Sequence, residues 1–137
     1  MSFETFEHQA DVGLALAAAD GPGLFVEAGL ALFSLLCDLG TVRERETYRL
    51  AGEAQDVEEL LVAWLNDLVY LFEAEGAVCS RISFPAWSET AYRAELRGER
   101  ADSGRHGLRG QVKAATYHGL AVTRDASGWH ARVILDV

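Results

Sequence analysis

Two aspartates near opposite ends of the chain are the residues whose types most directly suggest chemistry. Asp11 lies in EHQADVG, just before an apolar stretch, and Asp136 lies in the last strand-like segment, GWHARVILDV. If the chain ends at Val137, its terminal carboxylate adds two more oxygens. Such acidic groups would repel one another if the fold brought them together. A hard cation such as calcium or magnesium, which takes oxygen ligands, would then relieve the repulsion.

Spacing alone does not show that these groups meet, because 125 positions separate Asp11 from Asp136. Solvated carboxylates at two separate strand ends are the alternative interpretation. His8 and His118 are isolated histidines, and such residues more often make hydrogen bonds at a strand end than perform catalysis. We find no activated serine or cysteine pattern, no glycine-rich phosphate loop and no histidine pair at metal-ligand spacing. The sequence therefore offers no recognisable nucleophile.

The charge balance limits the classes of partner. The 137 residues include 21 acidic and 12 basic side chains, which gives a net charge of −9. This charge repels a phosphate backbone, so we expect any RNA-related role to run through another protein. Cys37 and Cys79 lie far apart in apolar surroundings without metal or redox spacing, and we interpret them as small buried hydrophobic residues.

The length and the apolar pattern predict one domain, residues 1–137, in a soluble cytoplasmic protein. No apolar run approaches the roughly 20 residues of a membrane span. The opening MSFETFEH has neither the basic nor the apolar region of a signal peptide. We therefore expect no contact with a membrane.

The segments that must position the aspartates follow two periodicities. The three-and-four spacing of apolar residues predicts two helices, and alternation predicts strands, mostly from residue 77 onward. The predicted fold is therefore α+β, with two helices packed on a largely antiparallel sheet. The predicted helices are 24–39 and 56–76; the predicted strands are 12–19, 43–50, 77–84, 88–96, 111–124 and 128–137.

The local signals differ in strength between the two helices. Asp56 is a predicted N-cap with Glu59 three residues later, and Gly76 is a predicted stop. The first helix is apolar nearly all round, which indicates burial on more than one side, and Gly40 is its predicted stop. The last two strands are expected to form a hairpin that turns at DASG, 125–128.

Five segments resemble the archease family, in the same order and across nearly the whole chain. They are FEHQADVG, GLALFSLLCDL, EELLVAWLNDLVYLFEAEG, VKAATYHGL and the terminal RVILDV. The resemblance implies an accessory protein that activates an RtcB-type tRNA-splicing RNA ligase. It would promote guanylylation of the ligase and its multiple turnover, and would broaden its nucleotide specificity, without being an enzyme itself.

The resemblance also implies a divalent metal, calcium foremost and magnesium or manganese as alternatives, bound by Asp11, Asp136 and Val137. His8, Lys113 and His118 are then candidates for the contact surface with the ligase, and RNA would be reached only through the ligase. Two residues depart from the family pattern: Gln9 replaces a usual threonine, and Val137 replaces an isoleucine. The change at Gln9 would alter how Asp11 is held.

Two other functions stay open on the residues alone. One is a small metal-dependent hydrolase that uses the same carboxylates with His8 or His118 as general base. The other is an interaction domain whose metal is purely structural.

Overall fold

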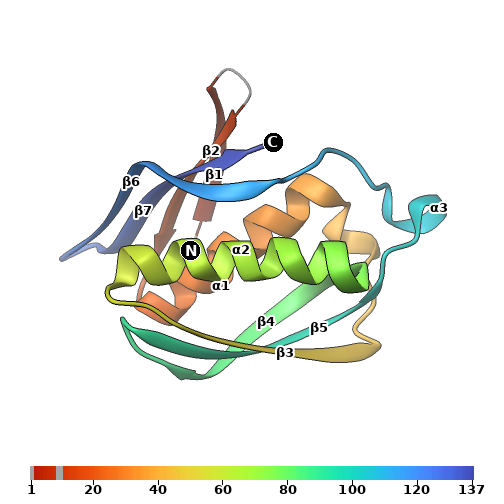
Figure 1. The fold of residues 1–137 in the computed structure, drawn as a ribbon, viewed down its shortest axis with the longest axis horizontal. Coiled ribbons are helices and arrows are strands. Elements are labelled where there is room, and N and C mark those ends of the chain that lie inside the picture. Colours follow the sequence, from red (N-terminus) through yellow and green to blue (C-terminus); the bar gives the residue numbers. More distant parts are fainter. Residues whose placement is uncertain (1, 9–10) are drawn as a thin grey trace.

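The computed structural model describes residues 2–8 and 11–137, with the backbone alone at residues 6–8. Over these residues two long helices pack against antiparallel strands, which confirms the α+β class (Figure 1). The elements are β1 (Ser2–His8), β2 (Asp11–Ala18), α1 (Gly21–Leu36), the 3-10 helix η1 (Leu39–Thr41), β3 (Glu46–Glu53), α2 (Val57–Glu75), β4 (Ala77–Trp87), β5 (Ala91–Arg100), α3 (Ser103–His106), β6 (Ala114–Asp125) and β7 (Gly128–Asp136).

The described strands divide between two sheets instead of forming one. One sheet has the order β1-β2-β7-β6 and the other has the order β3-β5-β4. Figure 1 shows α1 and α2 between them, with the first sheet above and the second below. The apolar surface around α1 explains this arrangement, because a helix that is apolar on several sides must be covered on several sides. Both termini of the described chain belong to the first sheet.

The helix α2 confirms its predicted boundaries. Asp56 caps it by accepting the backbone N–H of Glu59 at 2.8 Å. Gly76 ends it with φ of 64°, and its N–H donates to the carbonyl of Phe72 at 2.9 Å. A residue with a Cβ would be strained at that φ, so glycine is the expected type here.

The helix α1 lies three residues earlier than predicted at both ends. Asp20 caps it by accepting the N–H of Gly23 at 2.7 Å, and Pro22 lies in its first turn. The helix ends at Leu36, because Asp38 accepts the N–H of Gly40 and starts η1. The predicted stop at Gly40 was therefore wrong.

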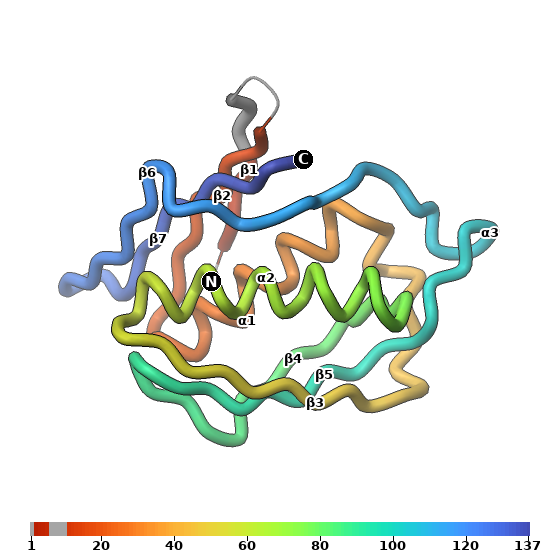
Figure 2. Tube along the Cα trace, viewed as in Figure 1, coloured from red at the N-terminus to blue at the C-terminus, as the bar shows by residue number. Residues whose placement is uncertain are grey.

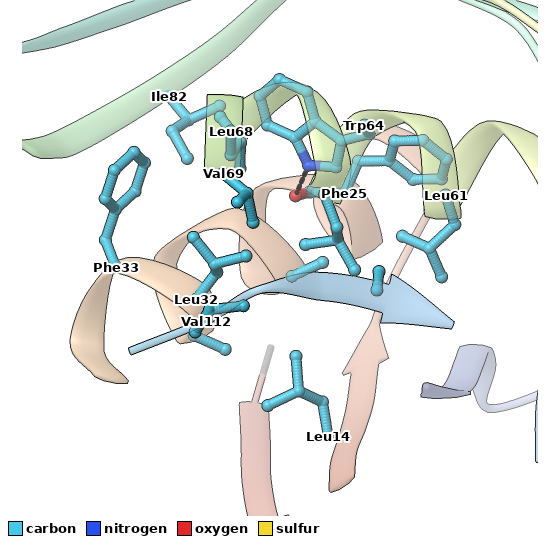
Figure 3. Packing of buried hydrophobic residues seen from close by; sticks show 14 of the residues in the cluster. Leu14, Phe25, Leu32, Phe33, Leu61, Trp64, Leu68, Val69, Ile82 and Val112 are labelled. Carbon is cyan, nitrogen blue, oxygen red and sulfur yellow. Dashed lines mark hydrogen bonds between the residues drawn. The ribbon is translucent and has the colours of Figure 1, made fainter. Parts of the chain in front are cut away.

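The core lies between the two helices and both sheets (Figure 3). The indole N–H of Trp64 on α2 donates to the carbonyl of Phe25 on α1 at 2.8 Å, which satisfies a polar group in the centre of the core. Cys37 and Cys79 are both buried thiols, as predicted. Among the described residues, no helix is both long and apolar enough to cross a membrane.

The strand β1 was not predicted, and several strand ends shift. The strand β3 begins at Glu46 instead of residue 43, and β6 begins at Ala114 instead of residue 111. The final hairpin turns where it was predicted, since Asp125 pairs with Gly128.

Candidate functional site

The two candidate aspartates lie directly opposite each other in the first sheet. Asp11, the first residue of β2, is the Cα partner of Asp136, the last residue of β7. The same row extends to His8 on β1 and to Ala114 on β6. Figure 2 shows the C-terminal strand beside β2 at this end of the molecule. The sheet therefore brings together residues that the sequence separates by most of its length.

Two carboxylates in this register repel each other. Cβ atoms directly opposite in an antiparallel pair are about 5 Å apart, and like charges in such a pair are destabilising. Coulomb's law gives roughly 1–3 kcal/mol for two unit charges at about 5 Å, for effective dielectric constants from water down to about 20. Asp11 and Asp136 are both partly buried, which limits their screening by solvent. A cation that binds both side chains would convert this repulsion into attraction.

The connection before β6 holds Asp136 in place. The backbone N–H of Lys113 donates to the carbonyl of Asp136 at 2.8 Å, and the Lys113 side chain is exposed. Upstream, the backbone N–H of Arg109 donates to the carbonyl of Leu36 at 2.9 Å, and its guanidinium donates to that of Ser34 at 3.1 Å. The segment that carries Lys113 is thus tied to the end of α1.

A hollow of about 300 Å³ adjoins the aspartate row, and its lining is almost wholly apolar. Val137 lines it, and so does Val12, the residue after Asp11. The other lining residues are Leu35, Gly110 and Gln111. Successive side chains of a strand point to opposite faces, so Val12 lines the hollow from the face of β2 opposite to Asp11.

Sequence reasoning missed Asn66, which joins α2 to the start of β6. Its side-chain oxygen accepts the N–H of Ala115 at 2.8 Å, and its amide nitrogen donates to the carbonyl of the same residue at 3.5 Å. The signal was available in part, since Asn66 lies outside the apolar stripe of a helix that is otherwise well packed. No sequence feature, however, identified Ala115 as its partner.

The alternation of a regular strand would place Lys113, Ala115 and Tyr117 on one face. Ala115 is buried, whereas Lys113 and Tyr117 are exposed. Lys113 lies before the start of β6, and a register shift between Thr116 and Ala121 breaks the two-residue period at Tyr117. His118 lies in this shifted segment and is exposed.

Two predictions fall partly or wholly outside the described residues. The backbone of His8 is described and pairs with Asp11, but its side chain is not. Gln9 lies outside the described residues.

The donor set at the aspartate row suits a cation that takes oxygen ligands. Within the described residues, no group of three or more His, Cys, Asp or Glu side chains gathers at one point. Of the described part of the chain, the aspartate row thus offers two carboxylates and the oxygens of Val137, which is fewer than the six to eight ligands of calcium. Such a site leaves room for water or for oxygens from another molecule.

A second acidic centre, formed by Glu99 near the end of β5 and by the residues of α3, was not predicted. Glu99 is buried and binds the guanidinium of Arg105 through two contacts of 2.7 Å. It also accepts the N–H of Arg43 at 2.8 Å, and its Oε2 lies 2.9 Å from Nε2 of His106. The N–H of Asp102 donates to Nδ1 of His106 at 2.8 Å, so Nε2 carries the proton that His106 donates to Glu99. The Arg105 guanidinium holds the pKa of Glu99 well below its usual range.

Comparisons with known proteins agree with the fold and its extent. Residues 3–137 match the Archease protein family (MTH1598/TM1083). The chain is 34% identical to the protein archease of Methanopyrus kandleri, over the full length of both chains. It is 28% identical to the protein archease-like of Drosophila melanogaster, over 100% of this chain and 91% of that protein.

Two solved structures share the architecture. The solution structure of protein 1598 from Methanobacterium thermoautotrophicum matches with a TM-score of 0.81 at 27% identity, over 98% of each chain. A crystal structure from Thermotoga maritima, described as an archease and possible chaperone, matches with a TM-score of 0.66 at 20% identity, over 98% of this chain and 96% of that chain.

Proposed function

Because this chain belongs to the archease family, we propose that it is a metal-binding activator of an RtcB-type tRNA-splicing RNA ligase. It promotes guanylylation of the ligase and its multiple turnover, broadens the nucleotides that the ligase accepts, and acts in the cytoplasm. The observation that carries the proposal is the direct pairing of Asp11 with Asp136 across β2 and β7. Opposed like charges are unfavourable by themselves, and locally unfavourable arrangements of this kind are typical of functional sites.

The proposed cation is calcium, with magnesium and manganese as alternatives. Asp11 and Asp136 hold it through their carboxylates, and Val137 contributes a main-chain or carboxylate oxygen. A divalent cation at such a place neutralises and orients the oxygens of a triphosphate during phosphoryl transfer. The described residues supply too few ligands to fill its coordination, which supports a site that is shared with a nucleotide or with the ligase.

Residues around the aspartate pair position it or contact the ligase in this proposal. The Lys113 backbone fixes Asp136 through its hydrogen bond, and its exposed ammonium faces solvent from the same end of the sheet. His8 and His118 are the other proposed contacts with the ligase. We assign no catalytic group to this chain, since the activity is that of the ligase.

The charge of the chain favours indirect contact with RNA. A net charge of −9 opposes binding to a phosphate backbone, so RNA is reached through the ligase. The same charge suits a partner whose nucleotide pocket is basic.

The test is the rate of guanylylation of a purified RtcB-type ligase with GTP, with and without this protein. We expect stimulation by the natural chain and a loss of roughly 10- to 100-fold with Asp136→Asn, the size typical of a damaged metal centre. Glu53→Gln, which removes the same charge at an exposed position of β3, is the matched control and should stimulate fully.

Three outcomes would contradict the proposal. Full stimulation by both Asp11→Asn and Asp136→Asn would show that the two carboxylates are not needed for activation of the ligase. Stimulation unchanged by a chelator would favour an interaction domain with a structural metal. Metal-dependent hydrolysis by the protein alone would favour a separate enzyme.

A further inference from the structure

The strand β6 carries a bulge beside the aspartate row. Thr116 pairs with Ile134, and the next pair joins Ala121 to Arg132, so residues 117–120 stand opposite the single residue Val133. Gly119 in this segment has φ of 65°, and no atom lies within 4 Å of the position where a Cβ would be. The bulge is therefore open to solvent. Bulges of this kind redirect side chains, and they are frequent next to functional sites.

The bulge exposes an aromatic ring. Tyr117 is 61% exposed. Among the described residues, only two other large hydrophobic side chains, Tyr70 and Leu108, are also exposed. A tyrosine combines a large apolar ring with a hydroxyl group, and tyrosines are enriched among the residues that dominate binding energy at protein interfaces. The exposed ring is thus a candidate anchor for another protein.

The segment before the bulge is held from two sides. The Thr116 hydroxyl donates to the carbonyl of Ile134 at 3.0 Å, and Asn66 makes its two hydrogen bonds to Ala115. Both contacts fix the backbone within two residues of Tyr117. An anchor held this way loses little conformational freedom on binding.

The bulge also lies within the area that a bound protein would cover. Ala114 is the partner of Asp136, and Tyr117 follows three residues later, which is about 10 Å along a strand. A standard interface covers about 800 Å² of each partner, equivalent to a disc of about 16 Å radius. A protein centred on the aspartate pair therefore covers the part of β6 that carries Tyr117.

We propose that Tyr117 is the docking anchor of this surface, and that its ring enters an apolar pocket of the ligase. The inference rests on the proposed function, which names the partner. The exposed ammonium of Lys113 lies at the same end of the sheet and would pair with a carboxylate at the rim of that apolar pocket, apart from the basic nucleotide pocket. Tyr117 provides affinity, whereas the aspartate pair provides the activation.

The test separates affinity from activation. The protein is titrated into the ligase with GTP, and the initial rate of guanylylation is fitted to a half-maximal concentration and a plateau. Tyr117→Ala should raise the half-maximal concentration about 10- to 30-fold and leave the plateau unchanged. Tyr117→Phe keeps the ring and should stay within about 3-fold of the natural chain. Arg93→Ala, an exposed residue of the other sheet, is the control and should change neither quantity.

Direct binding of the two purified proteins, measured by biolayer interferometry, distinguishes failure of this inference from failure of the proposed function. Weaker binding of Tyr117→Ala than of the natural chain supports the anchor. If the natural chain binds the ligase without stimulating it, only the proposed activation is contradicted. Superimposable binding curves for Tyr117→Ala and the natural chain overturn the anchor alone. A lowered plateau at unchanged half-maximal concentration also overturns it, and no binding by the natural chain overturns both.

Discussion

Two acidic centres of this molecule differ in the charges that surround their carboxylates. Glu99 is buried, and Arg105, His106 and the N–H of Arg43 surround it with matching donors. Asp136 is partly buried and faces a second aspartate across the sheet, and no cationic side chain of the described residues forms an ion pair with it. The first arrangement surrounds a carboxylate with opposite charge, whereas the second sets two like charges opposite each other, where we propose that an external cation binds. Burial of a carboxylate alone thus does not identify a functional site; the charges around it do.

The largest expected effect concerns the Glu99 centre. His106 is fully buried, and both of its ring nitrogens form hydrogen bonds. The substitution His106→Ala therefore leaves a cavity and leaves the N–H of Asp102 without an acceptor. We expect the free energy of unfolding to fall by about 3 kcal/mol, measured by urea denaturation. Once folded, this variant should still stimulate the ligase at a saturating concentration. A loss of plateau stimulation in the folded variant would show that the two centres are not independent.

The second prediction follows from the lowered pKa of Glu99. Its ordinary value is 4.5, so its charged form adds stability above that pH and loses the contribution as the pH falls through and below 4.5. The free energy of unfolding of the natural chain should exceed that of Glu99→Gln at pH 7, and this difference should become smaller at low pH. Urea denaturation at pH 7, 5, 4 and 3 measures it. If the difference stays constant with pH, the charge of Glu99 does not stabilise the fold.

The smallest expected effect has the opposite sign. Asp136→Asn removes a like-charge contact, so in the presence of a chelator it should raise the free energy of unfolding by about 1 kcal/mol and the Tm by a few degrees. Glu53→Gln is the control and should change neither value appreciably. A clear fall in stability for Asp136→Asn would mean that Asp136 is satisfied as Glu99 is, and the contrast between the centres would disappear.

Much of the fold was predictable because its signals are local. The capping residue Asp56 and the stop at Gly76 define α2 within a few positions, and period-two alternation located the later strands. The division into two sheets was not predictable in this way, since alternation indicates which face is buried but not which strand is the neighbour. The end of α1 was misplaced because the apolar pattern continues beyond Leu36, while the Asp38 turn ends the helix.

The candidate site was predictable in residues but not in geometry. The residue types of Asp11 and Asp136 suggested a metal, and only the β2–β7 register shows that they face each other. Glu99 was overlooked because it shares its strand face with the exposed Arg93 and Arg97, and it becomes buried when the following segment, with Arg105 and His106, folds over it. The bulge at Tyr117 was also missed, because an irregular segment of four residues opposite a single residue leaves no periodic signal.

A calorimetric titration of calcium into the natural chain and into Asp136→Asn shows whether the paired aspartates bind the ion. We expect one bound ion per chain for the natural protein and an affinity at least roughly 10-fold lower for the variant. Binding of equal stoichiometry and affinity in both proteins would contradict the claim that the paired aspartates form the metal site.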